Sequence, residues 1–315
     1  MANSTKTVLV LGAAGRVGKA TAQAFLNAGY RVRTATRDGR SVLPGAEPVK
    51  ADAMDVAQLR AAFAGADIIF NGLNPPYEKW QAVALPMARN VMEAMRGSAA
   101  LHLFPGNVYA FGSPMPPVLR EDTPQRPTAL KGQIRVDMEA LFAAEAKAHV
   151  TRTIVLRAGD FFGGKGGWFD QAVTSRLTKG VFVAPGPMEL PHAWAYLPDL
   201  AATFVRVADV ADQLEPFTAL HFPGHTTTLA ELKRSMEAAR GKPLKTSALP
   251  WWLIRLSAPF MPMNRELLEM RYLWQEPHQL QSARLARLIG EVPHTPLDEA
   301  IRQTLAGEAR GNIAA

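Results

Sequence analysis

The sequence contains no cysteine among its 315 residues. This absence excludes disulfide bonds, thiolate nucleophiles and cysteine-ligated zinc or iron–sulfur sites, and we expect no metal site. No run of about 18 apolar residues occurs, so no membrane-spanning helix is predicted. The first residues lack the apolar core and cleavage site of a secretory signal, and we therefore expect a cytoplasmic protein.

Charged residues are modest in number, at 20%, but they are unevenly placed. The net charge is +7, and residues 1–50 hold eight basic and two acidic side chains, a net of +6. Such a concentration suits either a nucleic-acid surface or a pocket for a phosphorylated cofactor. The hydrophobic content of 48% is typical of a globular enzyme.

Short apolar segments alternate with helical segments along the chain. Strands are predicted at 7–11, 31–36, 49–52, 68–71, 101–104, 153–157, 192–196 and 219–222, and helices at 19–28, 56–64, 80–95, 133–147, 199–210 and 229–239. This alternation predicts an α/β fold with a doubly wound parallel sheet. We assign a cofactor-binding domain to residues 1–165, completed by 195–224. A smaller substrate-binding region is assigned to 166–194 and 225–315.

Three glycines with the spacing Gly12-x-x-Gly15-x-x-Gly18 lie between the first strand and the first helix. Gly12 permits the tight turn, Gly15 lets the backbone approach a pyrophosphate, and Gly18 allows the helix to pack closely on the strand. The helix N-terminus adds partial positive charge. We therefore predict a dinucleotide site that includes the loop residues Ala14 and Val17. An ordinary tight turn is the alternative.

The end of the second strand distinguishes the two nicotinamide cofactors. NAD sites usually place an acidic residue there to bind the ribose 2′-hydroxyl, whereas this strand ends in Thr36-Arg37. An arginine suits the 2′-phosphate of NADP. Arg16 in the glycine loop is predicted to clamp the same phosphate, with Arg40 as a further contributor. We expect NADP(H) as the cofactor, although Asp38 can still reach a ribose hydroxyl, and a solvated basic face is the alternative.

These features resemble the extended and atypical short-chain dehydrogenase/reductases, the group that contains sugar-nucleotide epimerases and dehydratases. The segments Leu156-Arg-Ala-Gly-Asp-Phe-Phe-Gly163 and Ala195-Tyr-Leu-Pro-Asp-Leu-Ala201 are similar to motifs of this group. The resemblance implies a Rossmann fold, with Asp52 on the adenine side of the cofactor. Four residues at the end of the fourth strand are candidates for the adenine ribose side or else form a turn: Asn71, Gly72, Leu73 and Asn74. Phe161 either frames the nicotinamide or packs in the core.

The catalytic positions depart from the pattern of that group, which has Ser or Thr followed by Tyr-x-x-x-Lys. No Tyr-x-x-x-Lys occurs in this sequence. Alignment on Ala110-Phe-Gly112 puts Asn107 at the serine position, Lys131 at the tyrosine position and Arg135 at the lysine position. Lys131-x-x-x-Arg135-x-x-x-Glu139 resembles the corresponding helix of isoflavone-reductase-like reductases, in which the lysine transfers the proton.

The resemblance implies that Lys131 contacts the cofactor beside its nicotinamide and is the proton donor or base, and that Asn107 orients a carbonyl group. A free lysine has a pKa of about 10.4. Burial and the positive charge of an oxidised nicotinamide would both lower that pKa. Alternatively, the ammonium polarises a carbonyl without transferring its proton. A solvated lysine in an inactive site is the remaining interpretation.

We therefore expect an NADPH-dependent oxidoreductase that reduces a small carbonyl or conjugated compound, aromatic compounds included. A non-catalytic NADP sensor and a sugar-nucleotide epimerase- or dehydratase-like enzyme are the alternatives. The expected partners are a small-molecule substrate and a second copy, in a homodimer joined through the helices at 80–95 and 133–147, but no nucleic acid. Residues 251–263 are rich in tryptophan and methionine, yet prolines interrupt an amphipathic helix there, so no membrane contact is predicted.

Overall fold

The computed structural model describes residues 5–148 and 151–313. Its centre is a seven-stranded sheet in the order β11-β7-β5-β4-β1-β2-β3, and every neighbouring pair is parallel. These strands are β1 (Thr7–Leu11), β2 (Arg31–Thr36), β3 (Glu47–Lys50), β4 (Ile68–Asn71), β5 (Leu101–Asn107), β7 (Arg152–Ala158) and β11 (Phe217–His221). The predicted α/β fold with a doubly wound parallel sheet is confirmed.

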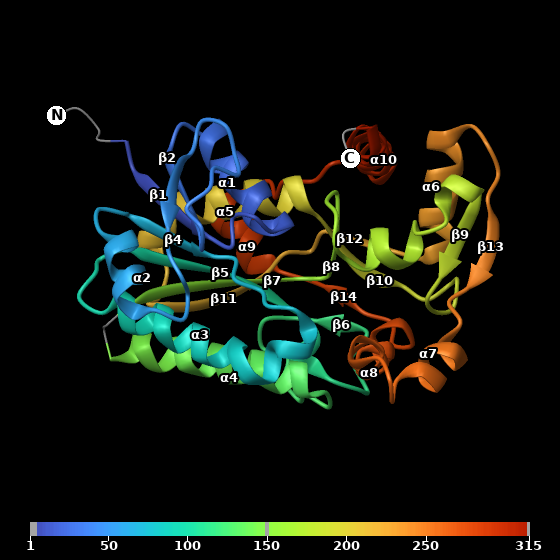
Figure 1. The fold of residues 1–315 in the computed structure, drawn as a ribbon, viewed down its shortest axis with the longest axis horizontal. Coiled ribbons are helices and arrows are strands. Elements are labelled where there is room, and N and C mark those ends of the chain that lie inside the picture. The colour runs from blue at the N-terminus through green and yellow to red at the C-terminus, as the bar shows by residue number, and fades with distance from the viewer. Residues whose placement is uncertain (1–4, 149–150, 314–315) are drawn as a thin grey trace.

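Helices cover both faces of this sheet (Figure 1). One face carries α1 (Arg16–Asn27), α5 (Leu197–Asp209) and α9 (Ala283–Ile289). The other face carries α2 (Val56–Phe63), α3 (Trp80–Met95) and α4 (Leu130–Lys147). The strand residues Val8 to Leu11 are buried because helices lie on both sides of them, which explains why β1 reads as an unbroken apolar run.

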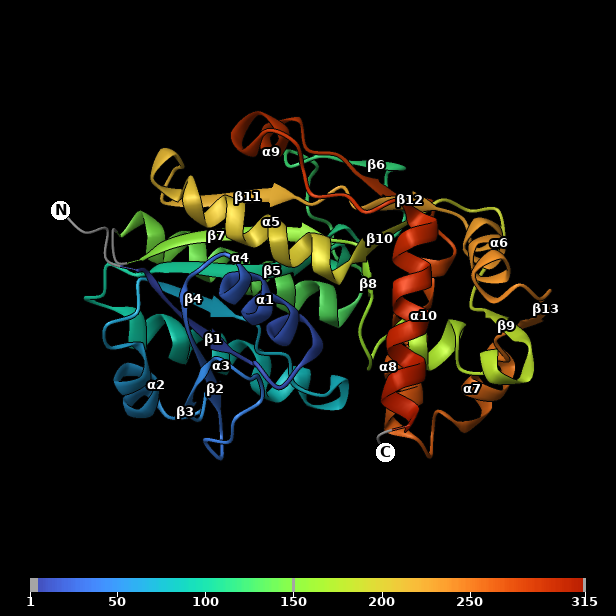
Figure 2. The same cartoon turned by 90° about the horizontal axis from the view of Figure 1, so that it is seen from above.

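Strand order reverses between β1 and β4, because the chain winds outward from this point in both directions. A doubly wound sheet leaves a crevice at the carboxyl ends of its strands at such a reversal, and ligands bind there. Figure 2 shows that the strands point toward the C-terminal part of the chain, which faces this edge of the sheet. The fold therefore directs the loops after β1, β2, β4, β5 and β7 to one side.

Three smaller sheets and further helices lie beside the central sheet. The small sheets are β12-β10-β8, β13-β9 and β14-β6, and β6 and β8 come from the first half of the chain and its middle. The strand bounds are β6 (Val118–Leu119), β8 (Asp160–Phe162), β9 (Val181–Ala184), β10 (His192–Tyr196), β12 (His225–Thr227), β13 (Lys245–Ala248) and β14 (Gln279–Leu280). The helices are α6 (Leu229–Arg240), α7 (Trp251–Ser257), α8 (Pro262–Glu269) and α10 (Leu297–Ile313).

The tryptophan- and methionine-rich stretch forms two helices, which the sequence did not predict. Pro250 is the N-cap residue of α7, and Pro262 is the first residue of α8. Proline is tolerated at these positions because the first helical N–H groups have no partner within the helix. Across the described ranges, no helix combines the length and the apolar character that a membrane span requires.

Candidate active site

The glycine loop has the tight geometry that its spacing predicts. Gly12 has a φ of +70°, and a Cβ atom built on it would lie 2.4 Å from the carbonyl oxygen of Gly72. A Cβ atom on Gly18 would lie 2.4 Å from the carbonyl oxygen of Gly12. Both obstacles are backbone atoms that cannot move aside. The loops after β1 and β4 are thus held in contact, and only glycine fits at the two positions.

The N-terminus of α1 is open to an anion. Gly15 is its N-cap residue, so no side chain occupies the first N–H groups of the helix. The first turn holds no acidic residue that would repel a phosphate. Ala14 is exposed in the loop, while Val17 packs against the core beneath α1 and α5. A free helix N-terminus next to a glycine turn is a site for a phosphate group.

Arg16 follows this loop as the first residue of α1. Its guanidinium lies over the ring of Phe161, 5.5 Å from the ring centroid, and a Cβ on Gly167 would come within 1.6 Å of Nη1. Phe161 follows β7, three strands from β1, whereas Arg37 follows β2 on the opposite side of β1. A phosphate clamp shared by Arg16 and Arg37 therefore stays a prediction, and Nη1 of Arg16 is buried without a hydrogen-bond partner.

Arg37 is exposed directly after β2 and makes no hydrogen bond or ion pair with the residues that the structure describes. The neighbouring residues Asp38 and Arg40 interact with each other. Asp38 accepts a hydrogen bond from the backbone N–H of Arg40 at 3.2 Å, and this bond holds the pKa of Asp38 below its usual value. The Arg40 side chain lies 3.7 Å from the same carboxylate. Arg37 is therefore the cation of this segment that is free to meet a phosphate.

The other predicted cofactor residues lie on the same side of the sheet but have protein partners. Asp52, after β3, accepts a hydrogen bond from the N–H of Met54 at 2.9 Å. Asn71 is buried, with Nδ2 3.2 Å from Nε2 of His102 and Oδ1 accepting from the N–H of Leu73. Asn71 thus shapes the turn after β4, while a cofactor contact by Asp52 or Asn71 stays a prediction.

Lys131, the predicted proton donor, is surrounded by a cluster of polar side chains. It lies in the first turn of α4 and is 1% exposed. Its ammonium donates to the carboxylates of Glu266 and Glu269, which project from α8. Its backbone N–H also donates to Oε1 of Glu269, at 3.1 Å. The dry surroundings predicted for Lys131 are present, but its ion pairs with the two carboxylates were not predicted.

Three tyrosines, which the sequence did not single out, lie beside this cluster. The Lys131 ammonium is 5.2 Å from the ring centroid of Tyr77, and the hydroxyls of Tyr77 and Tyr109 are 2.8 Å apart. Tyr272 donates to the carbonyl oxygen of Tyr109 at 3.4 Å. Burial raises the pKa of Tyr77 and of Tyr109, so both are neutral phenols. Asn107 accepts from the N–H of Tyr109 at 3.1 Å, which leaves its amide NH₂ as a donor.

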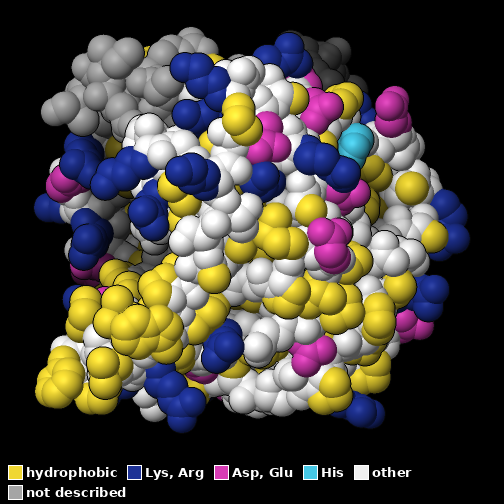
Figure 3. Space-filling model, turned by 90° about the vertical axis from the view of Figure 1, so that its right-hand side faces the viewer, with side chains coloured by type: hydrophobic (Ala, Val, Ile, Leu, Met, Phe, Trp, Pro, Cys, Tyr) yellow, Lys and Arg dark blue, Asp and Glu magenta, His cyan; other side chains and the backbone are white. Residues whose placement is uncertain are grey.

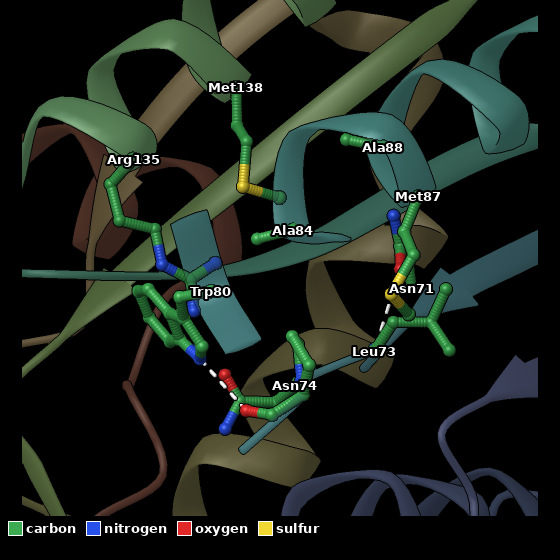
Figure 4. Close-up of a pocket in the computed structure, with 10 residues that line it drawn as sticks. Asn71, Leu73, Asn74, Trp80, Ala84, Met87, Ala88, Arg135 and Met138 are labelled. Atoms are coloured by element: carbon green, nitrogen blue, oxygen red, sulfur yellow. Dashed lines mark hydrogen bonds between the residues drawn. The ribbon is translucent and has the colours of Figure 1, made fainter. Parts of the chain in front are cut away.

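Arg135 and Glu139 follow Lys131 on the same face of α4, as their spacing predicts. The Arg135 guanidinium lies between two rings, 4.7 Å from the centroid of Trp80 and 5.1 Å from that of Phe104. Its Nε is buried without a partner, and burial lowers the pKa of Arg135. Figure 4 shows Arg135 beside Trp80 in a small pocket that the loop after β4 also lines.

Glu266 and Glu269 are the functional candidates that sequence reasoning missed. Their i, i+3 spacing places both carboxylates on one face of a helix, which is the only signal that the sequence carries. Nothing local indicates that this face meets Lys131, which precedes Glu266 by 135 residues.

Comparison with known proteins agrees with this geometry. Residues 12–105 match a family described as NAD(P)H-binding. The UDP-glucose 4-epimerase of Bifidobacterium longum, solved with NAD⁺ and UDP, has a TM-score of 0.77 at 18% identity, over 98% of this chain and 99% of that one. The UDP-glucose 4-epimerase of Brucella ovis, solved with NAD, has a TM-score of 0.77 at 17% identity, over 96% and 98%. No curated protein matches the sequence.

Residues 12–105 therefore match an NAD(P)H-binding family, and the chain has the fold of the UDP-glucose 4-epimerase structures to which it is similar. This confirms the predicted resemblance. Identities this low establish the fold alone, and one fold can host many reactions.

Proposed function

We propose that this protein is an NADP(H)-dependent oxidoreductase that reduces a small carbonyl or conjugated compound, with Lys131 as the proton donor. The NAD(P)H-binding match over residues 12–105 supports the cofactor class. The glycine cradle and the buried Lys131 both lie at the carboxyl edge of the sheet. A cofactor site and a proton donor at the same edge support the reaction class.

The cofactor groups fit residues that the structure leaves without partners. The free N-terminus of α1 and the orphaned Nη1 of Arg16 supply donors for the diphosphate. The unpaired Arg37 supplies a cation for the 2′-phosphate, which NAD lacks. Bound NADPH would provide a hydride for the substrate carbon.

The observation that carries the proposal is the surroundings of Lys131. Its ammonium is buried, but Glu266 and Glu269 are 26% and 23% exposed. The carboxylates therefore link a dry donor to solvent. When hydride reaches a carbonyl carbon, Lys131 gives a proton to the developing alkoxide, and the two glutamates relay its replacement from water. The free NH₂ of Asn107 can hold the same oxygen.

Replacing Lys131 with Met tests this role. Removal of a general acid typically lowers turnover by about 10²–10⁴-fold, and NADPH affinity should stay unchanged because Lys131 does not lie in the glycine loop. Lys147→Met is the control, since Lys147 is exposed at the other end of the same helix. The substrate is first found by screening aldehydes, enones and quinones for NADPH oxidation. Equal turnover by Lys131→Met and its parent would reject the mechanism.

A non-catalytic NADP sensor is the second candidate, and the same cluster supports it. The two carboxylates already pair with the Lys131 ammonium, as they would in a site where the lysine has a structural role. Tight NADPH binding with no oxidation of any screened compound would favour the sensor. The epimerase-like alternative lacks support from the site, because a lysine stands where that reaction's tyrosine would be.

A further inference from the structure

Exposed hydrophobic side chains gather on one short segment of the chain. Within the described ranges, eight large hydrophobic side chains are exposed, and six of them lie between residues 252 and 263. We call this set the apolar tip; it consists of Trp252, Leu253, Leu256, Phe260, Met261 and Met263. Figure 3 shows hydrophobic side chains massed at the lower left of that face, where α7 and α8 lie. Isolated exposed apolar residues are ordinary, but a contiguous group marks an interaction surface.

The tip is built so that its largest side chains project outward. Trp252 is 70% exposed and Phe260 is 86% exposed. Trp252 and Leu256 are one helical turn apart on α7, and Phe260 follows in the turn before α8. The prolines therefore divide the stretch into two helices without interrupting its apolar face, which removes the objection to a membrane contact that the sequence raised.

The charged side chains along the segment that forms the tip all have one sign. From residue 240 to residue 265 the chain carries five basic side chains and no acidic one. Four of the five are exposed and have no ion pair among the described residues: Lys242, Lys245, Arg255 and Arg265. The fifth, Arg240, donates to the carbonyl oxygen of Leu177. Glu266 and Glu269, the next acidic residues, point inward to Lys131 and do not cancel this charge.

We propose that the apolar tip docks on the surface of an anionic lipid bilayer, so that the protein binds membranes peripherally. Tryptophan, phenylalanine and leucine enter the boundary between headgroups and acyl chains, and the flanking cations meet anionic headgroups. Each basic side chain near such a surface contributes about 1 kcal/mol, or about fivefold in binding.

The charge pattern favours this occupant over a second copy of the chain. In a symmetric dimer through the tip, the same uncompensated cations would face one another and repel. A bilayer with anionic lipids meets both the apolar side chains and the cations. The predicted dimer through α3 and α4 would leave the tip uncovered, because Leu130 is the one exposed large hydrophobic residue on those helices in the described chain.

The docking surface is continuous with the candidate active site. Helix α8 begins within the tip at Pro262 and places Glu266 and Glu269, about one and two turns later, beside Lys131. A membrane at the tip would therefore lie next to the proton donor. The docking proposal does not depend on the proposed reaction, since binding to lipid can be measured without a substrate or cofactor.

Co-sedimentation with lipid vesicles tests the proposal on the full chain. We expect binding to vesicles of phosphatidylcholine with phosphatidylserine, weak binding to phosphatidylcholine alone, and loss of binding at high salt. Trp252→Ser with Phe260→Ser should reduce binding at least tenfold. Met54→Ser is the matched control, because Met54 is as exposed as Met261, at 52%, but lies after β3.

A second pair of variants isolates the charge. Lys245→Glu with Arg255→Glu should reduce binding to anionic vesicles by more than tenfold, whereas Lys6→Glu with Lys147→Glu changes the net charge equally and should retain it. These lysines are exposed and lie outside the tip. No binding to anionic vesicles, or equal binding by all variants, would overturn the proposal. So would a dimer in sedimentation velocity that only the tip variants dissociate, because the tip would then bind a second copy.

Discussion

Glu139 of α4 and Arg157 of β7 form a buried ion pair, with Oε2 of Glu139 2.6 Å from Nη2 of Arg157. Nε of Arg157 also donates to both carboxylate oxygens, at 3.1 and 3.2 Å. Gln125 donates to the same carboxylate at 2.9 Å. The third residue of the Lys-x-x-x-Arg-x-x-x-Glu helix therefore joins α4 to the sheet, while the first residue faces the candidate active site.

Glu139→Ala should lower the free energy of unfolding by about 3–5 kcal/mol, because it leaves the Arg157 guanidinium buried without its counter-charge. Glu47→Ala is the control. Glu47 pairs with Arg31 at a similar distance of 2.7 Å, but both side chains are exposed, so the loss should stay below about 1 kcal/mol. Urea denaturation of the two variants gives the comparison, and equal losses would contradict a structural role for the buried pair.

Gly18→Ala should abolish NADPH binding or unfold the loop, because its Cβ would stand 2.4 Å from the carbonyl oxygen of Gly12. Gly307→Ala changes another helical glycine, in α10, that has nothing within 4 Å of the Cβ position. That control should bind NADPH as the parent does and gain up to about 1 kcal/mol in stability. Fluorescence titration with NADPH and thermal unfolding measure both effects, and a Gly18→Ala protein that binds normally would disprove the cradle.

NADPH should bind more tightly than NADH. Arg37 is not paired with another residue of the protein, and only NADPH carries a 2′-phosphate with which Arg37 can pair. Hydrogen bonds to a charged group contribute about 1.5–3 kcal/mol, so Arg37→Ala should weaken NADPH by about 10–100-fold and leave NADH nearly unchanged. Arg31→Ala, at the other end of β2, is the control. Parallel fluorescence titrations provide the test. Equal affinities of the parent protein for the two cofactors would refute the assignment of Arg37.

Stability should fall as the pH drops below about 6.5, the pKa of an unfolded histidine. Burial lowers the pKa of His102 to about 3 and that of His278 to about 3, so the folded state keeps both neutral. Between these pH values the unfolded chain binds more protons. Each histidine therefore removes about 1.4 kcal/mol of stability per pH unit as the solution is acidified.

His278→Asn offers a check on this slope. Nδ1 of His278 contacts the carbonyl oxygen of Glu276 at 2.9 Å, and an asparagine amide can donate in its place. Urea midpoints measured between about pH 7.5 and about pH 5 should show a shallower pH dependence in this variant. The same slope in parent and variant would mean that His278 titrates alike in both states.

The sequence by itself determined the sheet and the glycine cradle. The alternation of strands and helices, the burial of β1 and the turn at Gly12 depend on residues close together in the chain. Their geometry follows from backbone sterics and from the periodicity of apolar residues, which neighbouring segments cannot easily override. The end of β2 also depends on residues close together in the chain, so the sequence places Arg37 at the carboxyl edge of the sheet.

Only the tertiary structure decided what surrounds Lys131, where Arg16 points and which side chains stay exposed. The carboxylates of Glu266 and Glu269 reach Lys131 because α8 packs beside the start of α4, more than 130 residues away. Tyr77, Tyr109 and Tyr272 come together from three separate segments. The partner of a buried charge is set by the packing of distant segments, and a helical period predicts which residues share a face but not what that face meets.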